Sequence, residues 1–207
     1  MQGIGRDGQV QVEQIEVDGQ LSADGVPVIF HDAKLDRVTD RIGPLAARSA
    51  AELKALNIFQ GGGLIMTLDE ELEILAPSGL TLRCEDKPGV DLAPYPRIVD
   101  KVFQALAPRR LVERTVLTSF HLPTLRQVLD RAPALSDVIW LVSDQIVRPT
   151  SPDHVAMLAA AVGVGAVSLH HKVLDDRVLA VLRDAGLRVV AFGVLEDEGL
   201  PRSCTRA

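Results

Sequence analysis

The chain alternates short apolar runs with longer segments in which apolar residues recur every three to four positions. Short apolar runs bounded by Gly, Pro, Asn and Asp are typical of β-strands, and the three-to-four spacing is typical of amphipathic helices. Strands are predicted at residues 10–20, 26–30, 80–84, 115–120, 138–142, 166–169 and 187–194. Helices are predicted at residues 47–56, 71–75, 95–106, 122–131, 152–162 and 175–185.

This order of strands and helices predicts an α/β protein with a parallel sheet. Seven strands joined by helices indicate a TIM-type (β/α)8 barrel, a fold with eight strands and about 250 residues. Because the chain has 207 residues, we expect one such barrel domain over residues 1–207, and we expect it to be incomplete. An open doubly wound sheet is the alternative that the alternation alone leaves open.

Several helix ends carry local signals in the sequence. Thr67 followed by Glu70 has the pattern of a capping box, in which each side chain bonds the backbone of the other residue. Ser151 is predicted to cap the helix that follows it, and Gly186 to close the helix before it. Pro96 is expected in the first turn of its helix, where proline is tolerated.

Residues 15–32 combine two apolar runs with acidic residues and a histidine. Glu16 and Asp18 are two positions apart in a predicted strand, so both side chains project from the same face of the sheet. A turn is predicted at residues 22–25, and the next strand ends at His31. Converging carboxylates repel one another, and a divalent cation removes that penalty. The pattern indicates a site for a hard cation with a proton-transfer group beside it; the alternative is a solvated strand face.

The same residues resemble a known family, the glycerophosphodiester phosphodiesterases. Its members have a strand with an acid-x-Asp pattern, a polar turn with Asp-Gly and a strand that ends in His-Asp. The similarity continues at Leu35-Asp36-Arg37-Val38-Thr39, Ala51-Glu52-Leu53-Lys54-Ala55-Leu56, Thr67-Leu68-Asp69-Glu70, Glu85-Asp86-Lys87, Ser119-Phe120 and Ala185-Gly186-Leu187-Arg188-Val189-Val190. The resemblance covers residues 13–195, and it implies a barrel of the TIM type.

The resemblance implies hydrolysis of a glycerophosphodiester to glycerol 3-phosphate and an alcohol. It also implies that Glu16, Asp18 and Glu85 bind a divalent cation, Mg²⁺ or Ca²⁺, through oxygen ligands. His31 matches a proton-transfer histidine of the family, and its ordinary pKa near neutrality suits that role. Asp32 is expected to orient His31 or form a turn, and not to transfer a proton.

Lys87 is expected to act in both catalysis and substrate binding, because its positive charge would lie where negative charge develops on the phosphate. Phe120 and His170 are expected to bind substrate by lining its pocket. His121 and His171 are weaker candidates for the same role, with an ordinary surface role as the alternative. Active-site residues of a TIM barrel lie at the carboxyl ends of its strands. The polar residues predicted at or just past strand ends are Glu16, Asp18, His31, Glu85, Lys87, Ser119, His121, Asp144, His170 and His171.

Both ends of the chain differ from the family pattern. Family members begin with a strand ending in His-Arg and a Pro-Glu-Asn loop, neither of which precedes Glu16. Phe192-Gly193-Val194-Leu195 stands where the family usually has Trp-Thr-Val-Asn. We therefore expect a domain that is truncated at both ends, lacks the first βα unit and is impaired in activity. Residues 10–14 and 187–194 would form unpaired sheet edges, through which we expect a homo-oligomer.

Three classes of function remain open from the sequence. The first is a phosphodiester hydrolase. The second is a catalytically inactive barrel that still binds a divalent cation or a phosphodiester, and the third is a structural or interaction barrel. Calorimetric titration with Ca²⁺ or Mg²⁺ separates the third class from the others, and an assay on glycerophosphocholine separates the first from the second.

Composition narrows the class of protein further. The net charge of −6 and the 3% aromatic content argue against a nucleic-acid-binding protein. No apolar run reaches the roughly 18 residues of a membrane helix, and residues 1–9 are too polar for a signal peptide. The two cysteines, Cys84 and Cys204, do not suggest a disulfide framework. We therefore expect a cytoplasmic protein in which Cys84 is a small core residue.

Overall fold

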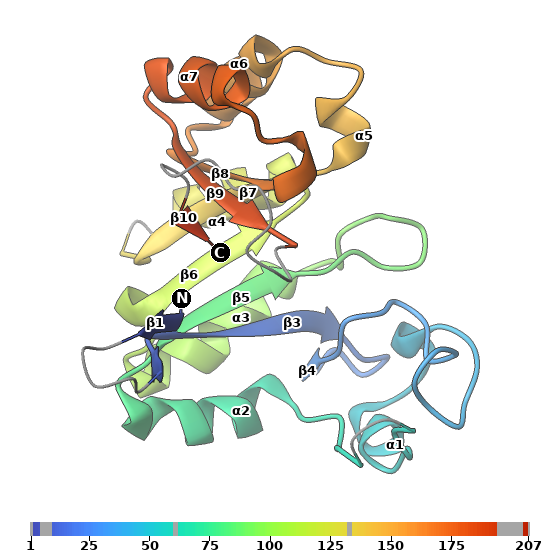
Figure 1. The fold of residues 1–207 in the computed structure, drawn as a ribbon. Coiled ribbons are helices and arrows are strands. Elements are labelled where there is room, and N and C mark those ends of the chain that lie inside the picture. The colour runs from blue at the N-terminus through green and yellow to red at the C-terminus, as the bar shows by residue number, and fades with distance from the viewer. Residues whose placement is uncertain (1, 5–9, 60–61, 132–133, 194–204, 207) are drawn as a thin grey trace. The chain divides into compact units, whose positions relative to one another are not determined.

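The computed structural model describes residues 2–4, 10–59, 62–131, 134–193 and 205–206 (Figure 1). The chain forms two compact units. The N-terminal unit comprises Val12–Leu117 and Ala134–Ser136. The C-terminal unit comprises Met1–Gln11, Thr118–Pro133 and Asp137–Ala207.

The N-terminal unit is built on two parallel strands, β3 (Gln14–Leu21) and β5 (Thr81–Asp86). Their register runs from Gln14 opposite Thr81 to Gly19 opposite Asp86. The other elements of this unit are β4 (Pro27–Ile29), α1 (Ala50–Lys54), α2 (Leu68–Leu75), α3 (Ile98–Leu106), the short 3₁₀ helices η1 (Leu45–Ala47), η2 (Ala76–Ser78), η3 (Ala107–Arg109) and η4 (Val112–Arg114), and the first residues of β6 (Thr115–Ser119).

Strand β4 runs antiparallel to β3, with Gly19 opposite Ile29 and Leu21 opposite Pro27. The prediction that residues 26–30 form a further parallel strand is therefore wrong. The physical reason is the short connection, because residues 22–26 close a tight turn whereas a parallel crossover needs about a dozen residues or more. Ser22 Oγ accepts a hydrogen bond from Val26 N at 3.0 Å inside this turn.

The long segment between β4 and α2 forms an apolar cluster with Val28 of β4. The buried residues of this cluster include Leu45, Leu53 of α1, and Ile65. Ser49 and Glu52 form a capping box at the start of α1, so the helix predicted at 47–56 begins only after this cap.

Two further element boundaries differ from the predictions. Helix α3 begins at Ile98, so Pro96 lies before the helix and not in its first turn. Arg97, the residue just before α3, has a left-handed backbone (φ 66°), which stops the helix from extending backwards. The predicted first strand is divided at Glu13 into β3 and β2 (Val10–Val12).

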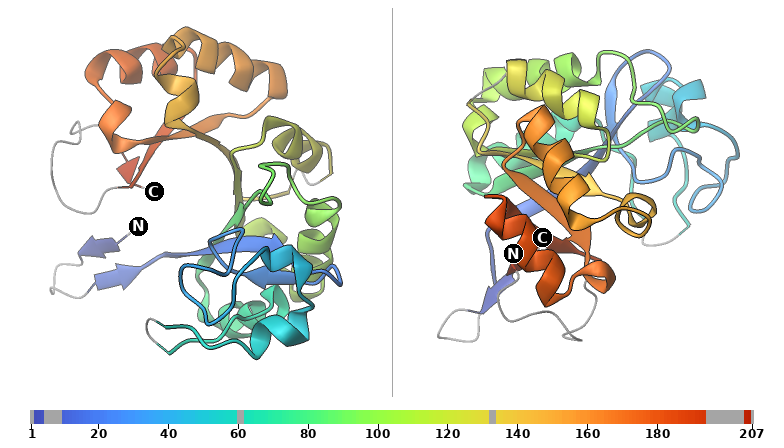
Figure 2. Two further views of the ribbon diagram at one scale, coloured as in Figure 1. Left: turned by 90° about the vertical axis from the view of Figure 1, so that its right-hand side faces the viewer. Right: turned by 90° about the horizontal axis from the view of Figure 1, so that it is seen from above.

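The C-terminal unit contains a run of parallel strands with helices packed against them. Its strands are β7 (Asp137–Val142), β8 (Ala166–His170), β9 (Arg188–Phe192) and β10 (Thr205–Arg206), and it also contains β1 (Gln2–Ile4). Its helices are α4 (Leu122–Arg131), α5 (Asp144–Val147), α6 (Pro152–Val162), the 3₁₀ helix η5 (His171–Val173) and α7 (Asp176–Asp184). Figure 2 shows α6 and α7 side by side. The bounds of α4 and α6 are those predicted, and Ser151 caps α6 as expected.

The strands follow one hydrogen-bonded order, β10-β9-β8-β7-β6-β5-β3-β4. The α/β class and the mostly parallel sheet are thus as predicted. The prediction that residues 10–14 and 187–194 form two unpaired sheet edges is wrong in part. Strand β2 pairs with β1, and β10 pairs with two residues of β9. Self-association stays a prediction. Each helix in the described part of the chain is too short or too polar to cross a bilayer.

The capping box at the start of α2 offers a test of local stability. Thr67 Oγ1 accepts a hydrogen bond from Glu70 N at 3.2 Å, and Glu70 Oε2 accepts one from Thr67 N at 2.9 Å. Thr67→Ala is expected to lower the free energy of unfolding by about 1 kcal/mol, measured by urea denaturation at pH 7.

Glu70→Gln tests the charge at the same cap, because glutamine keeps the capping oxygen but removes the charge. The hydrogen bond from Lys54, followed by the hydrogen bonds from the backbone and side chain of Thr67, lowers the pKa of Glu70 to about 2. A lowered pKa stabilises the fold above the ordinary value of 4.5, and the benefit is lost as the pH falls through about 2. The cost of Glu70→Gln should therefore fade between pH 5 and roughly pH 2. A cost that is constant over this range would contradict the ion pair.

Candidate active site

The register of β3 and β5 places acidic and basic side chains beside one another. Glu16 lies opposite Arg83, and Asp18 lies opposite Glu85. Because side chains alternate along a strand, Glu16 and Asp18 share one face of the sheet with their partners on β5. Gly19 allows the two strands to approach closely here, since a Cβ at this position would lie 3.3 Å from the carbonyl oxygen of Glu85.

Lys87 follows the end of β5 and joins two of these carboxylates. Its Nζ lies 2.7 Å from Glu85 Oε1 and 3.2 Å from Asp18 Oδ1. The side chains of Lys87 and Glu85 are 12% and 8% exposed, and that of Asp18 is 25% exposed. The predicted residues Asp18, Glu85 and Lys87 are therefore brought together in the structure.

Burial and neighbouring charges act together on Glu85 and Lys87. Burial raises the pKa of Glu85, and the charges of Asp18 and Glu16 raise it further against the effect of Lys87. Burial opposes the charge of Lys87, but the carboxylates of Glu85 and Asp18 outweigh it and raise its pKa. Arg83 faces Glu16, and Lys87 faces both Asp18 and Glu85.

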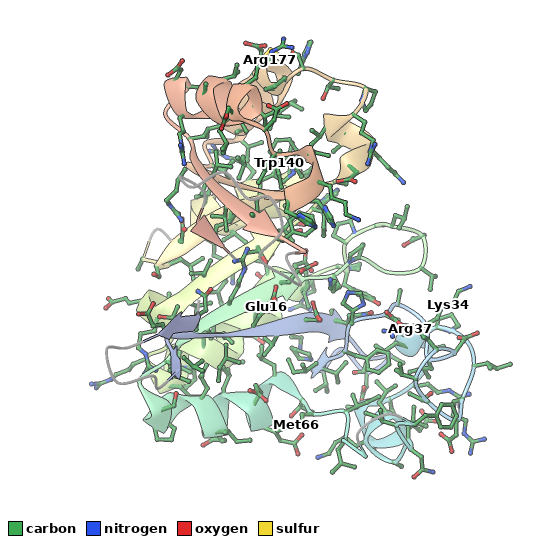
Figure 3. All side chains as sticks on the ribbon, in the orientation of Figure 1. Glu16, Lys34, Arg37, Met66, Trp140 and Arg177 are labelled. Carbon is green, nitrogen blue, oxygen red and sulfur yellow. The ribbon has the colours of Figure 1, made fainter. Side chains whose placement is uncertain are left out.

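Glu16 lies somewhat apart from the other two acids. Its side chain projects from β3 (Figure 3). It is 58% exposed, and its Oε1 is 4.0 Å from Arg83 Nε. Among the residues that the structure describes, no group of three or more His, Cys, Asp or Glu side chains is arranged to hold a metal ion. Asp18 and Glu85 converge on Lys87, and Glu16 stays at the solvent side of the same strand face.

His31 follows β4 and is held through its neighbour Asp32. His31 Nδ1 lies 2.7 Å from Asp32 Oδ1, and 64% of the His31 side chain is exposed. Arg37 donates to the same carboxylate, from Nε at 2.6 Å and from Nη2 at 3.2 Å (Figure 3). Arg37 is the main cause that lowers the pKa of Asp32, with burial opposing it and His31 contributing. An ionised Asp32 accepts a hydrogen bond from the N–H group at Nδ1 of His31. Nε2 is therefore the ring atom that is available to exchange a proton with a ligand.

Sequence reasoning missed two polar residues of this site. Gln20 is fully buried and donates hydrogen bonds to the carbonyl oxygens of Phe30 and His31. It shares the two-residue period of Glu16 and Asp18, and this signal was present in the sequence. Arg37 lies within a stretch that resembles the family, but nothing in the sequence alone indicated its contact with Asp32.

Phe120 and His170, predicted to bind substrate, belong to the C-terminal unit. Both rings contact Phe192 edge to face, with ring centroids 6.3 Å and 5.4 Å away, respectively. The ring centroids of His171 and His170 lie 4.7 Å apart. Phe120 and His170 therefore belong to one aromatic cluster at the ends of β6, β8 and β9. Lys87, the third predicted substrate contact, belongs to the N-terminal unit.

Other residues predicted at strand ends have local structural roles. Ser119 Oγ accepts a hydrogen bond from His121 N at 3.0 Å, and His121 Nδ1 lies 3.0 Å from Thr124 Oγ1 at the start of α4. Asp144 is the first residue of α5 and forms an ion pair with Arg148.

The prediction that Glu16 and Asp18 lie at the carboxyl end of their strand is wrong. Glu16 and Asp18 lie inside β3, which continues to Leu21, and not at its carboxyl end. The hairpin with β4 supplies backbone partners for Gly19, Gln20 and Leu21, and this pairing lengthens the strand beyond the acids.

Comparisons with known proteins identify relatives of this chain. A curated glycerophosphodiester phosphodiesterase from Caldanaerobacter subterraneus is 34% identical over 133 residues, which are 61% of this chain and 54% of that protein. The protein of the same name from Bacillus subtilis is 24% identical and is matched over 94% of this chain and 71% of its own length. The match thus spans about half the length of the first of these relatives.

Solved structures share the fold. One from Agrobacterium tumefaciens, named as a candidate glycerophosphoryl diester phosphodiesterase, has a TM-score of 0.81 and 32% identity and covers 88% of this chain and 73% of its own. A phosphodiesterase from Oleispira antarctica, in complex with the product sn-glycerol-3-phosphate, has a TM-score of 0.74, 26% identity and coverages of 89% and 74%. The fold is therefore that of an incomplete TIM-type barrel. Because the sequence model of the glycerophosphoryl diester phosphodiesterase family matches residues 10–204, the chain belongs to that family.

Proposed function

We propose that this protein hydrolyses glycerophosphodiesters to glycerol 3-phosphate and an alcohol. The observation that carries the proposal is the ion-paired group of Asp18, Glu85 and Lys87 in the same unit as the His31–Asp32 pair. Membership of the family supports it. The related Oleispira antarctica protein, which binds sn-glycerol-3-phosphate, supports the nature of the product.

In this proposal His31 moves the proton. The oxygen of a water molecule forms a new bond to phosphorus, and the bond from phosphorus to the alcohol oxygen breaks. One proton leaves the water, and one proton ends on the departing alcohol. His31 Nε2 is suited to exchange one of these protons, because Asp32 holds Nδ1 and fixes the ring.

Lys87 stabilises the negative charge that develops on the phosphoryl oxygens. Its ammonium group is largely buried, so little water screens its charge. That Phe120 and His170 bind substrate stays a prediction, and the structure describes them only as part of the aromatic cluster within the C-terminal unit.

We propose a divalent cation from the donor chemistry of these acids and not from their arrangement, because Asp18 and Glu85 converge on Lys87 and no three acids among the described residues are placed to hold a metal ion. Asp18 and Glu85 would supply carboxylate oxygens, with Glu16 on the same strand face. Carboxylate oxygens are the ligands that Mg²⁺ and Ca²⁺ prefer. When bound, such an ion polarises phosphoryl oxygens.

Removal of divalent cations is expected to abolish hydrolysis, and adding Mg²⁺ or Ca²⁺ back should restore it. Calorimetric titration of the protein with each metal should give binding that Asp18→Asn weakens by at least about tenfold. Asp137→Asn, which alters an acid of the C-terminal unit beside Arg188, is the control and should bind metal normally. Full activity in the presence of a strong chelator would contradict the metal proposal.

The proposed activity is tested with glycerophosphocholine as substrate. Release of glycerol 3-phosphate is followed with a coupled dehydrogenase, at equal metal concentration and without added detergent. Turnover by the wild-type protein supports the proposal. Metal binding without turnover would instead support an inactive barrel, and the absence of both would leave a structural role.

A cytoplasmic location is also a proposal. It rests on Cys84, which is a free thiol, because proteins without disulfides are typical of a reducing compartment. Burial, with the charges of Asp86, Asp18 and Glu85, raises the pKa of Cys84 to about 12, so the thiol is a core group and not a nucleophile. Cell fractionation tests the location.

A further inference from the structure

Gln20 is a buried polar side chain that the proposed mechanism does not use. It lies on β3, two residues beyond Asp18, and its relative exposure is 0%. A buried carboxamide is costly unless its hydrogen-bonding groups find partners. Gln20 Nε2 donates to the carbonyl oxygens of Phe30 at 2.9 Å and His31 at 3.1 Å, and Gln20 Oε1 accepts from Tyr95 Oη at 2.8 Å.

The orientation of this carboxamide follows from its partners. Carbonyl oxygens only accept hydrogen bonds, so the Nε2 group must face Phe30 and His31. Oε1 of Gln20 is then left for Tyr95, whose hydroxyl must donate. Burial, together with the charges of Asp91 and Asp86, raises the pKa of Tyr95, so its hydroxyl keeps the proton that it donates.

The contact of Gln20 lies where the strand pairing ends. Ile29 is the last residue of β4, and the Phe30 amide then donates to the Asp18 carbonyl at 2.9 Å. His31 comes next, and its side chain is largely exposed. The position of an exposed imidazole depends on the backbone that carries it, and Gln20 bonds the peptide carbonyl of that residue.

We propose that Gln20 is a positioning residue for His31 and that Tyr95 holds Gln20 in its working orientation. The proposal rests on the role of His31 in the proposed function. Tyr95 lies in the loop between β5 and α3, which begins next to Lys87 (Figure 1). The bonds therefore connect three segments of the N-terminal unit: β3 with the acids, the peptide of His31, and the loop that follows Lys87.

The decisive variant is Gln20→Met, which has a similar size but no donor. We expect kcat for glycerophosphocholine to fall by about 10- to 100-fold with little change in KM, because a small displacement of His31 disturbs proton transfer more than binding. The matched control is Thr39→Val. Thr39 is also buried in the N-terminal unit and donates to the Leu35 carbonyl at 2.9 Å, but it does not contact His31.

A double-variant cycle separates positioning from general stability. In a His31→Ala background, Gln20→Met should lower kcat no further, since no imidazole remains to be positioned. A further loss equal to that in the wild-type background, or an equal loss in Thr39→Val, would overturn the proposal.

Nuclear magnetic resonance tests the same idea without activity. The ring signals of His31, identified by their absence in His31→Ala, should shift or broaden in Gln20→Met and stay unchanged in Thr39→Val. Unchanged His31 signals would overturn the positioning role even if the wild-type protein is active. Shifted signals in a protein without turnover would support the positioning role while the proposed function fails.

Tyr95→Phe serves if Gln20→Met does not fold. It removes one hydroxyl and keeps the carboxamide, so we expect a decrease in kcat of about 2- to 10-fold, in line with the loss of one neutral hydrogen bond. The decrease should again be absent in the His31→Ala background. An unchanged kcat together with unchanged His31 signals in Tyr95→Phe would overturn the part assigned to Tyr95, and the same result in Gln20→Met would overturn the whole.

Discussion

Replacing His31 with alanine is expected to lower kcat for glycerophosphocholine by about 10²–10⁴-fold, the range for losing a general acid or base. The side chain is 64% exposed, so the stability of the fold and KM should change little. Its contact with Asp32 holds the ring and would not be replaced by a methyl group. Steady-state kinetics at saturating metal, with a urea denaturation curve of each protein, measures both effects.

His154→Ala is the control for this variant. His154 is also exposed, but it lies in α6 of the C-terminal unit, where its Nδ1 is near Ser151 Oγ. Its kcat should equal that of the wild type. If His31→Ala retained more than about a tenth of the wild-type kcat, His31 would not be the proton-transfer group of this protein.

The second large effect is expected at Lys87. Lys87→Met leaves the carboxylates of Glu85 and Asp18 without their shared cation. Breaking a buried ion pair costs about 3–5 kcal/mol, and we expect a value at or below the low end of this range because Asp18 is partly exposed. The kcat should also fall by about 10²–10³-fold, as charge stabilisation at the phosphate is lost.

A second substitution separates the two consequences of losing Lys87. In Lys87→Met/Glu85→Gln the most buried carboxylate is neutral, so most of the lost stability should return in urea denaturation. Activity should not return, because neither the cation of Lys87 nor the carboxylate of Glu85 is restored. Recovery of activity along with stability would show that Lys87 serves only to keep the fold intact.

Local chemistry predicted some elements closely. Helices α4 and α6 have the predicted bounds, and the caps at Thr67 and Ser151 form as expected. These features depend on residues within one helical turn of each other, so the sequence contains all the partners. The antiparallel direction of β4 could also have been predicted from the sequence, because the short connection at residues 22–26 rules out a parallel crossover.

Other features depend on residues far apart in the chain. Tyr95 and Gln20 are 75 positions apart, and no local pattern indicates that one hydroxyl donates to the other side chain. Such contacts arise from packing, which propensity and periodicity do not contain.

For the site, strand periodicity and family resemblance were sufficient to identify the available groups: acids two apart on a strand, an imidazole beside a carboxylate, and a lysine two residues after a glutamate. The pairing of these groups follows from the fold. The register of β3 on β5 sets Asp18 beside Glu85 and Glu16 beside Arg83, and it brings Lys87 to two acids at once. The physical reason is that ion pairs and buried hydrogen bonds act over a few ångströms, and only the folded chain sets distances on that scale.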